Sequence, residues 1–189
     1  MNRLLLVVVV LVALRPGLAT SDSPKGTLPP GPARAWEEFK SAEGRFTATF
    51  PGHPQVSSKK SAAGNVTTTV GFTSDKINCA VSYTDYRKAD PKMTPEVMLK
   101  ALVDGFGKDV QSKKDIKLNG HEGVELVLAQ GDRKDAITYR AFYVSGRLFQ
   151  VLASAVPGDK EKADLLKFLD SFQLHEAKKD EEIKKGDKK

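Results

Sequence analysis

The second half of the chain repeats one pattern, short runs of strand-forming residues separated by pairs of turn residues, and this pattern limits the fold more than any other feature. Asn119-Gly120 and Ser145-Gly146 each lie between two such runs, and Asn-Gly in this setting is a strong hairpin signal. Gly131-Asp132 marks a third turn. The runs themselves cover residues 114–118, 123–130, 136–145 and 147–155. Because strands joined by tight hairpins pair antiparallel, the pattern predicts an antiparallel sheet.

The first half adds three more strands and a helix, and a second helix follows the hairpins. Strand patterns cover residues 45–50, 65–73 and 76–86. Thr94 followed by Pro95 predicts the start of a helix, since threonine caps free N–H groups and proline suits the first turn. Asp159 opens the second helix, and residues 172–174 predict a last short strand. We therefore predict an α+β fold, an antiparallel β-sheet flanked by helices.

Both ends of the chain differ in composition from this folded part. Residues 1–19 combine Arg3, an apolar run from Leu4 to Leu14 and small residues at 17–19, which predicts a signal peptide. The run is too short to cross a membrane as a helix, which needs about 20 residues. Residues 20–34 are rich in proline, glycine and serine and predict a disordered leader, and residues 176–189 predict a charged, disordered tail. We expect one domain at 35–175 in an exported protein, periplasmic or secreted, with no membrane span in the mature chain.

The distribution of charge bears on which partners the protein binds, and the cysteine content bears on disulfide formation. The formal net charge is +6, but it is spread over the signal, the body and the tail rather than gathered in a basic stripe. Nucleic acid is therefore not an expected partner. The single cysteine, Cys79, excludes an intramolecular disulfide and lies in an apolar stretch, where a buried thiol is expected rather than a reactive one.

Four segments of the chain resemble a known family of secreted proteins. They are Phe46–Pro54, Gly120–Glu125, Gly146–Val151 and Phe168–Phe172, and their order and spacing resemble the PsbP-like superfamily over residues 35–174. The resemblance implies an α/β/α sandwich, an antiparallel sheet between helices. The family includes extrinsic photosystem subunits and Ran-binding Mog-type proteins. Its motifs here are structural, and no cofactor-assembly motif accompanies them.

The residues of these segments are of types that form turns, end strands or pack in a core. Pro51 and Pro54 cannot sit in a central ladder, so they predict an edge strand that ends there. Gly120 and Gly123 predict turn or bulge positions beside a packed strand. Phe172 is expected to fix the last helix against the sheet, and its removal is expected to cost about 3–5 kcal/mol if it is buried.

Candidate chemistry is sparse. The sequence has no nucleophile elbow, no phosphate-binding loop and no paired metal-ligand motif, so we expect a protein that is not an enzyme and has no cofactor. His121 and Glu125 are the candidate ligands for a divalent metal, because strand alternation places both on the same face of the strand. A solvated hairpin with a surface carboxylate is the other interpretation of the same residues.

Two functions are compatible with these features. The first is an exported, non-enzymatic binding or assembly module that contacts another envelope or secreted protein. The alternative is a carrier of a small ligand or divalent metal in the cell envelope, with His121 and Glu125 as its ligands. An exposed apolar surface is expected of the first, and an enclosed pocket with convergent polar groups of the second.

Overall fold

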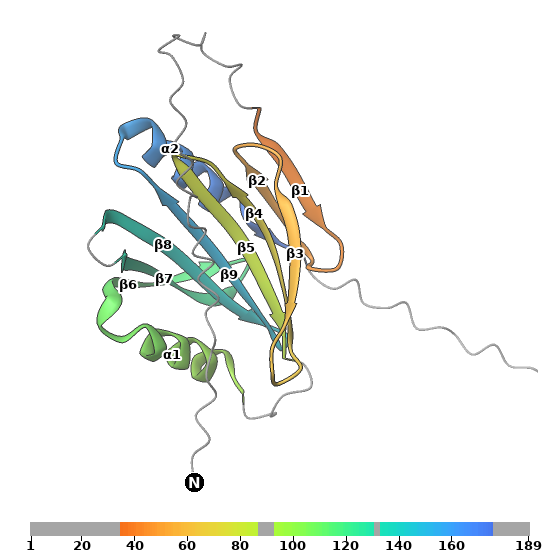
Figure 1. The fold of residues 1–189 in the computed structure, drawn as a ribbon. Coiled ribbons are helices and arrows are strands. Elements are labelled where there is room, and N and C mark those ends of the chain that lie inside the picture. Colours follow the sequence, from red (N-terminus) through yellow and green to blue (C-terminus); the bar gives the residue numbers. More distant parts are fainter. Residues whose placement is uncertain (1–34, 87–92, 131–132, 176–189) are drawn as a thin grey trace, which may run out of the picture.

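The computed structural model describes residues 35–86, 93–130 and 133–175 of the 189-residue chain. Ten strands and two α-helices lie in these ranges, and the strands form two separate antiparallel sheets (Figure 1). The predicted signal peptide, leader and charged tail, and the turn at 131–132, lie outside the described residues. Within the described ranges, no helix is long and apolar enough to cross a bilayer.

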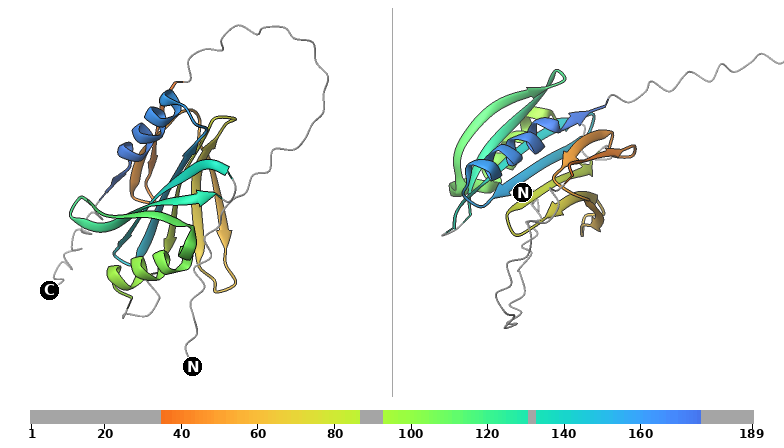
Figure 2. Two further views of the ribbon diagram at one scale, coloured as in Figure 1. Left: turned by 90° about the vertical axis from the view of Figure 1, so that its left-hand side faces the viewer. Right: turned by 90° about the horizontal axis from the view of Figure 1, so that it is seen from above.

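The larger sheet has seven strands in the order β3-β4-β5-β9-β8-β7-β6, and every neighbouring pair is antiparallel. The strands are β3 (Gln55–Lys60), β4 (Val66–Thr73), β5 (Ile77–Asp85), β6 (Val110–Leu118), β7 (His121–Gln130), β8 (Arg133–Val144) and β9 (Arg147–Ala155). The sheet is strongly twisted, so that β6–β8 cross the direction of β3–β5 steeply (Figure 2, left).

The predicted hairpin turns at 119–120 and 145–146 are confirmed. Asn119 has φ 51° and Gly120 has φ 81°, while Ser145 and Gly146 have φ 50° and 76°. Positive φ at both central residues is the geometry of the tight turn whose twist matches that of the flanking strands. These turns fix the register of β6 against β7 and of β8 against β9, where Leu118 pairs with His121 and Val144 with Arg147.

The smaller sheet has three strands in the order β1-β2-β10 and was predicted only in part. It contains β1 (Glu37–Ser41), β2 (Phe46–Phe50) and β10 (Gln173–Leu174). The predicted edge position of the strand before Pro51 is wrong, because β2 pairs with β1 on one side and with β10 on the other. Pro51 still ends that strand, and β2 occupies the centre of a sheet that is only three strands wide.

The two α-helices pack on opposite faces of the larger sheet (Figure 2). On one face, α1 (Pro95–Phe106) buries Met98 and Leu102 against β7 and β8. On the other, α2 (Asp159–Ser171) buries Phe168 and Leu169 among residues of β2, β5 and β9. Side chains of β8 and β9 therefore alternate between two apolar cores, one on each face of the sheet.

Strands dominate the molecule, so it is mainly β with helices packed against the sheet rather than an even mixture of the two. Two strands, β1 and β3, were not predicted, and β6 begins at Val110 rather than at residue 114. Gly123 lies inside β7, where an added Cβ would come within 2.4 Å of the Phe142 ring and 2.6 Å of the Ala141 carbonyl oxygen. Its role is close packing rather than a turn.

Candidate functional site: a groove between α1 and the edge of the large sheet

Helix α1 begins and ends at clear signals. The side chain of Thr94 accepts a hydrogen bond from the N–H of Val97 at 3.3 Å, and Pro95 occupies the first turn, as predicted. Gly107 closes the helix with φ 53°, a conformation that glycine adopts without strain. Met98 and Leu102 point into the core. The residues that directly follow them, Leu99 and Val103, therefore lie on the next side of the helix and face the outer strand β6.

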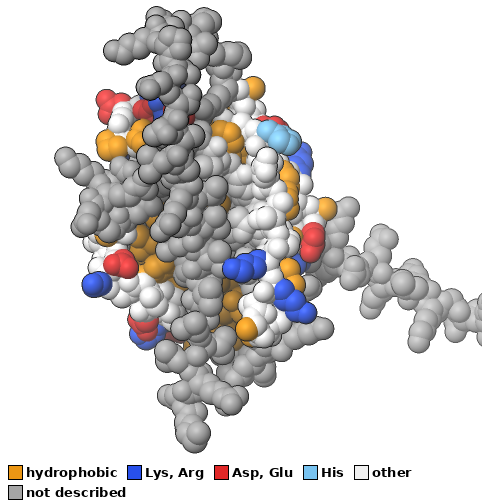
Figure 3. All heavy atoms as spheres, in the orientation of Figure 1, with side chains coloured by type: hydrophobic (Ala, Val, Ile, Leu, Met, Phe, Trp, Pro, Cys, Tyr) orange, Lys and Arg blue, Asp and Glu red, His pale blue; other side chains and the backbone are white. Residues whose placement is uncertain are grey.

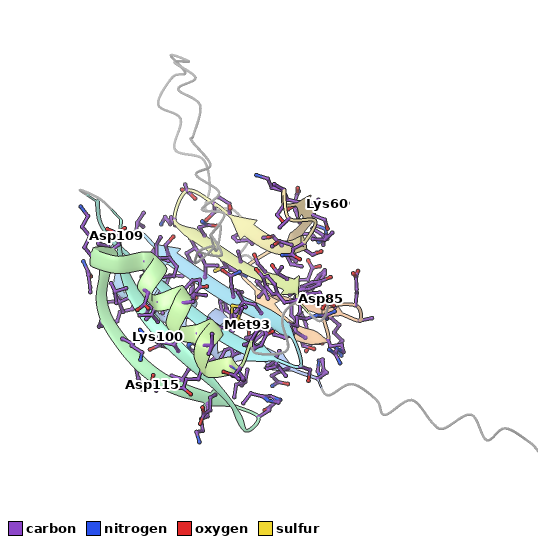
Figure 4. The ribbon with its side chains drawn as sticks, turned by 90° about the horizontal axis from the view of Figure 1, so that it is seen from below. Lys60, Asp85, Met93, Lys100, Asp109 and Asp115 are labelled. Atoms are coloured by element: carbon purple, nitrogen blue, oxygen red, sulfur yellow. The ribbon has the colours of Figure 1, made fainter. Side chains whose placement is uncertain are left out.

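A groove of about 570 Å³ lies between this side of α1 and the hairpin of β6 and β7. Its apolar side chains are Leu99 and Val103 on α1 and Val124 on β7, whereas the side chain of Ile116 packs against the core on the other face of the sheet. Charged residues surround it: Glu96, Lys100, Asp104, Lys113, Asp115, Lys117 and Glu122. Figure 4 shows Lys100 on the helix and Asp115 on β6, one on each wall.

Ion pairs within each wall neutralise most of this charge. Lys100 pairs with Asp104 at 2.9 Å along α1. On the strand side, Lys113 pairs with Asp115 at 3.2 Å, and Lys117 is 3.8 Å from Glu122 on β7. These six side chains are between 49% and 83% exposed, so each pair contributes little to stability. The groove thus has an apolar base and a solvated, nearly neutral rim.

The predicted metal ligands, His121 and Glu125, lie on β7 and share the opposite face of the sheet from the groove. Glu125 is ion-paired there, because the Nε of Arg140 donates to its Oε2 at 2.6 Å. The same guanidinium donates to the Leu169 carbonyl at 2.9 Å and to Asp170 at 3.0 Å, and so holds the end of α2. Among the described residues, no three His, Cys, Asp or Glu side chains gather as a metal site. The metal pair stays a prediction.

Arg147 forms the most buried charged contact in the described part of the chain, and sequence reasoning did not single it out. It is 5% exposed and lies 5.0 Å from the centre of the Tyr83 ring. Its guanidinium donates to the Glu43 carbonyl at 2.6 Å and to Asp85 at 3.2 Å. The bond to Glu43 attaches the β1–β2 turn to the large sheet, and the bond to Asp85 joins β9 to β5 within that sheet, so Arg147 has a structural role.

Cys79 is buried in the core between β4 and β9, as predicted. Burial raises the pKa of its thiol to about 12, and the negative charge of Asp164 adds to the rise. The thiol is therefore protonated at neutral pH and does not act as a nucleophile.

Comparison with known proteins supports the architecture. No protein-family model and no curated protein sequence matches this chain. Among solved structures, cyanobacterial PsbP (CyanoP) from Synechocystis sp. PCC 6803 is similar with a TM-score of 0.51 and 13% identity, covering 81% of this chain and 100% of that one. The fold is PsbP-like. The family resemblance drawn from the four sequence segments is thereby confirmed for the fold.

A second solved structure has lower similarity to the PsbP-like domain. It is a protein of unknown function from Pseudomonas aeruginosa, with a TM-score of 0.37 and 13% identity, covering 69% of this chain and 86% of that one.

The groove was not predicted, since its residues come from segments that look like ordinary solvated surface in the sequence. The one signal that points to it is the density of lysine from 113 to 117, because lysine is typical of edge strands.

Proposed function

We propose that this protein is an exported, non-enzymatic accessory module that binds another protein through the groove between α1 and β6. The observation that carries the proposal is the groove itself, an apolar base with a charged rim beside an edge strand. Protein interfaces have the same arrangement, a less charged centre surrounded by polar residues that stay in water. The PsbP-like fold adds support, because the family resemblance includes extrinsic subunits that work by attachment to larger assemblies.

The rim favours a protein partner over a small ligand. A small-molecule site orients its ligand with a few buried polar groups that converge on it. Here the paired charges are largely exposed, and they contact one another instead of pointing into the groove. A partner that covers Leu99 and Val103 would remove apolar area from water while leaving these ion pairs at the periphery, where little desolvation is required.

Capture experiments with matched variants test the proposal. The tagged protein is incubated with envelope and exported extracts, and bound proteins and small molecules are identified by mass spectrometry. Val103→Lys places a charge in the groove, and Asp115→Arg changes only its exposed rim. Val97→Lys is the control, because Val97 lies on the same helix, is 48% exposed and does not line the groove. Thermal unfolding confirms that each variant is folded.

We expect one protein at near-equal amount with the wild-type chain and Val97→Lys, and its loss with both groove variants. Capture that is the same for all four chains would contradict the groove as the binding surface. Recovery of a stoichiometric small molecule or metal in place of a protein would contradict the module and favour the carrier.

A further inference from the structure

Strand β6 ends the large sheet next to the groove. It is nine residues long and pairs with β7 on one side, and in the described part of the chain no strand pairs with its other side. Residues 111–115 and Lys117 are exposed. The backbone N–H and C=O groups on the outer side of such a strand are able to pair with a further strand.

The charge of this edge is positive. The segment Gly107–Leu118 carries four lysines against two aspartates. Lys113 and Lys117 face the groove side of the strand, and Lys114 faces the other side, where it has no ion-pair partner among the described residues. A second copy of β6 would bring a second positively charged strand beside the first, and like charges opposite one another disfavour pairing. The charge of this edge therefore disfavours pairing with β6 of a second copy of the protein and favours pairing with an acidic strand.

The other edge of the same sheet, β3, provides an internal comparison. It also carries two lysines, Lys59 and Lys60, and basic side chains are visible at the lower part of this edge (Figure 3). Every residue of β3 is exposed, and none of them lines the groove beside α1. β6 combines a positive edge with the apolar groove of α1, which lies within reach of an added strand.

We propose that the partner contributes an extended acidic segment that pairs with β6 and forms an eighth strand of the large sheet. This inference rests on the proposed function and specifies the kind of partner. Because side chains alternate along a strand, carboxylates of the segment opposite Lys113 and Lys117 lie on the groove side. The intervening residues lie on the other side, beside Lys114 and Ile116. Backbone hydrogen bonds supply the attachment, and charge sets the choice of segment.

Synthetic peptides test this pairing without knowledge of the natural partner. The probe is a nine-residue peptide of alternating glutamate and valine, blocked at both ends, with serine in place of the central glutamate so that no carboxylate lies opposite Asp115 when the flanking glutamates face Lys113 and Lys117. The control peptide has lysine in place of glutamate. Two further peptides carry N-methyl groups on the glutamates or on the valines, which removes the N–H donors from one edge of the peptide at a time. Binding is followed by the shifts of backbone amide NMR signals of the isotope-labelled protein.

We expect the acidic peptide to shift amides of Val110–Leu118 and the lysine peptide to leave them unchanged. Lys113→Glu with Lys117→Glu should weaken binding of the acidic peptide about tenfold, since two favourable cross-strand pairs become unfavourable. The matched double variant on the other edge, Lys59→Glu with Lys60→Glu, should leave binding unchanged. One of the two N-methylated peptides should lose binding and the other keep it, because only one edge of the peptide faces β6.

Three results would overturn the inference. They are no shifts in β6 at millimolar peptide, equal shifts in β3, and equal binding of both N-methylated peptides, which would indicate attraction by charge alone. The proposed function fails by a different observation, the absence of any captured protein. A captured protein that is lost with Val103→Lys but leaves the β6 amides unshifted would contradict only the added strand.

Discussion

Phe172 joins α2 to both sheets, and its replacement by alanine tests how the PsbP-like core is held together. The side chain is 3% exposed, and its ring centre lies 5.8 Å from that of Phe46 on β2, 6.1 Å from Phe142 on β8 and 6.3 Å from Phe149 on β9. Because three rings from two sheets surround it, the cavity left by alanine cannot close easily. We expect a loss of about 3–5 kcal/mol in the free energy of unfolding.

Urea unfolding followed by circular dichroism measures this loss. In a domain of this size it corresponds to a fall of roughly 6–20 °C in Tm. Phe172→Leu, which keeps most of the apolar volume, should lose less than alanine does. The control is Leu166→Ala on the outer side of α2, where the side chain is 46% exposed and a change within about 0.5 kcal/mol is expected. A loss below about 1 kcal/mol for Phe172→Ala would refute the view that this ring is a shared core residue of both sheets.

Gly123, Cys79 and the predicted metal pair each give a further expected outcome. Gly123→Ala should cost about 1–3 kcal/mol in urea unfolding, because the new Cβ meets a ring at 2.4 Å and a backbone oxygen at 2.6 Å. Gly105→Ala, which has open space around it in α1, should instead gain about 0.5–1 kcal/mol, and equal effects at the two sites would contradict this packing. Burial raises the pKa of Cys79 from 9.0 to about 12, so the folded chain holds this proton more tightly than the unfolded chain. The corresponding stability is complete below about pH 9 and is lost as the pH rises towards 12, and urea midpoints measured from pH 8 to 11 should fall less steeply for Cys79→Ala than for the wild-type chain. For the metal pair, the carboxylate of Glu125 is already ion-paired, so we expect less than one zinc per chain by elemental analysis at neutral pH, whereas one zinc that is lost in His121→Ala would establish the carrier.

The sequence predicted those elements whose signals are local. The tight turn at Asn119 and the helix cap at Thr94 depend on neighbouring residues, and both are where the pattern placed them. β3 was missed because none of its residues is buried, so its sequence shows no alternation of apolar and polar residues. Its register comes from pairing with β4. The central position of β2 was missed for a similar reason, since its neighbour β10 is more than 120 residues away in the chain.

The candidate site was harder to predict than the fold. The groove exists because α1 packs on β7 and β8, while the side of the helix with Leu99 and Val103 faces β6 without filling the space between them. This arrangement depends on tertiary packing and not on the local sequence. Its charged residues have the composition of any solvated surface. The interpretation of Glu125 as a metal ligand did not include Arg140, because the pairing of β7 with β8 that places Arg140 opposite Glu125 is not readable from residue types alone.

Site-specific photo-crosslinking in intact envelopes tests the central claim, that the groove binds a protein, most directly. A photoreactive amino acid replaces Lys100 on the groove wall, and the control places it at Val97 on the same helix. We predict that Lys100 crosslinks to one defined protein and that Val97 does not. Crosslinking of the same protein from both positions, or of no protein from Lys100, would contradict the account.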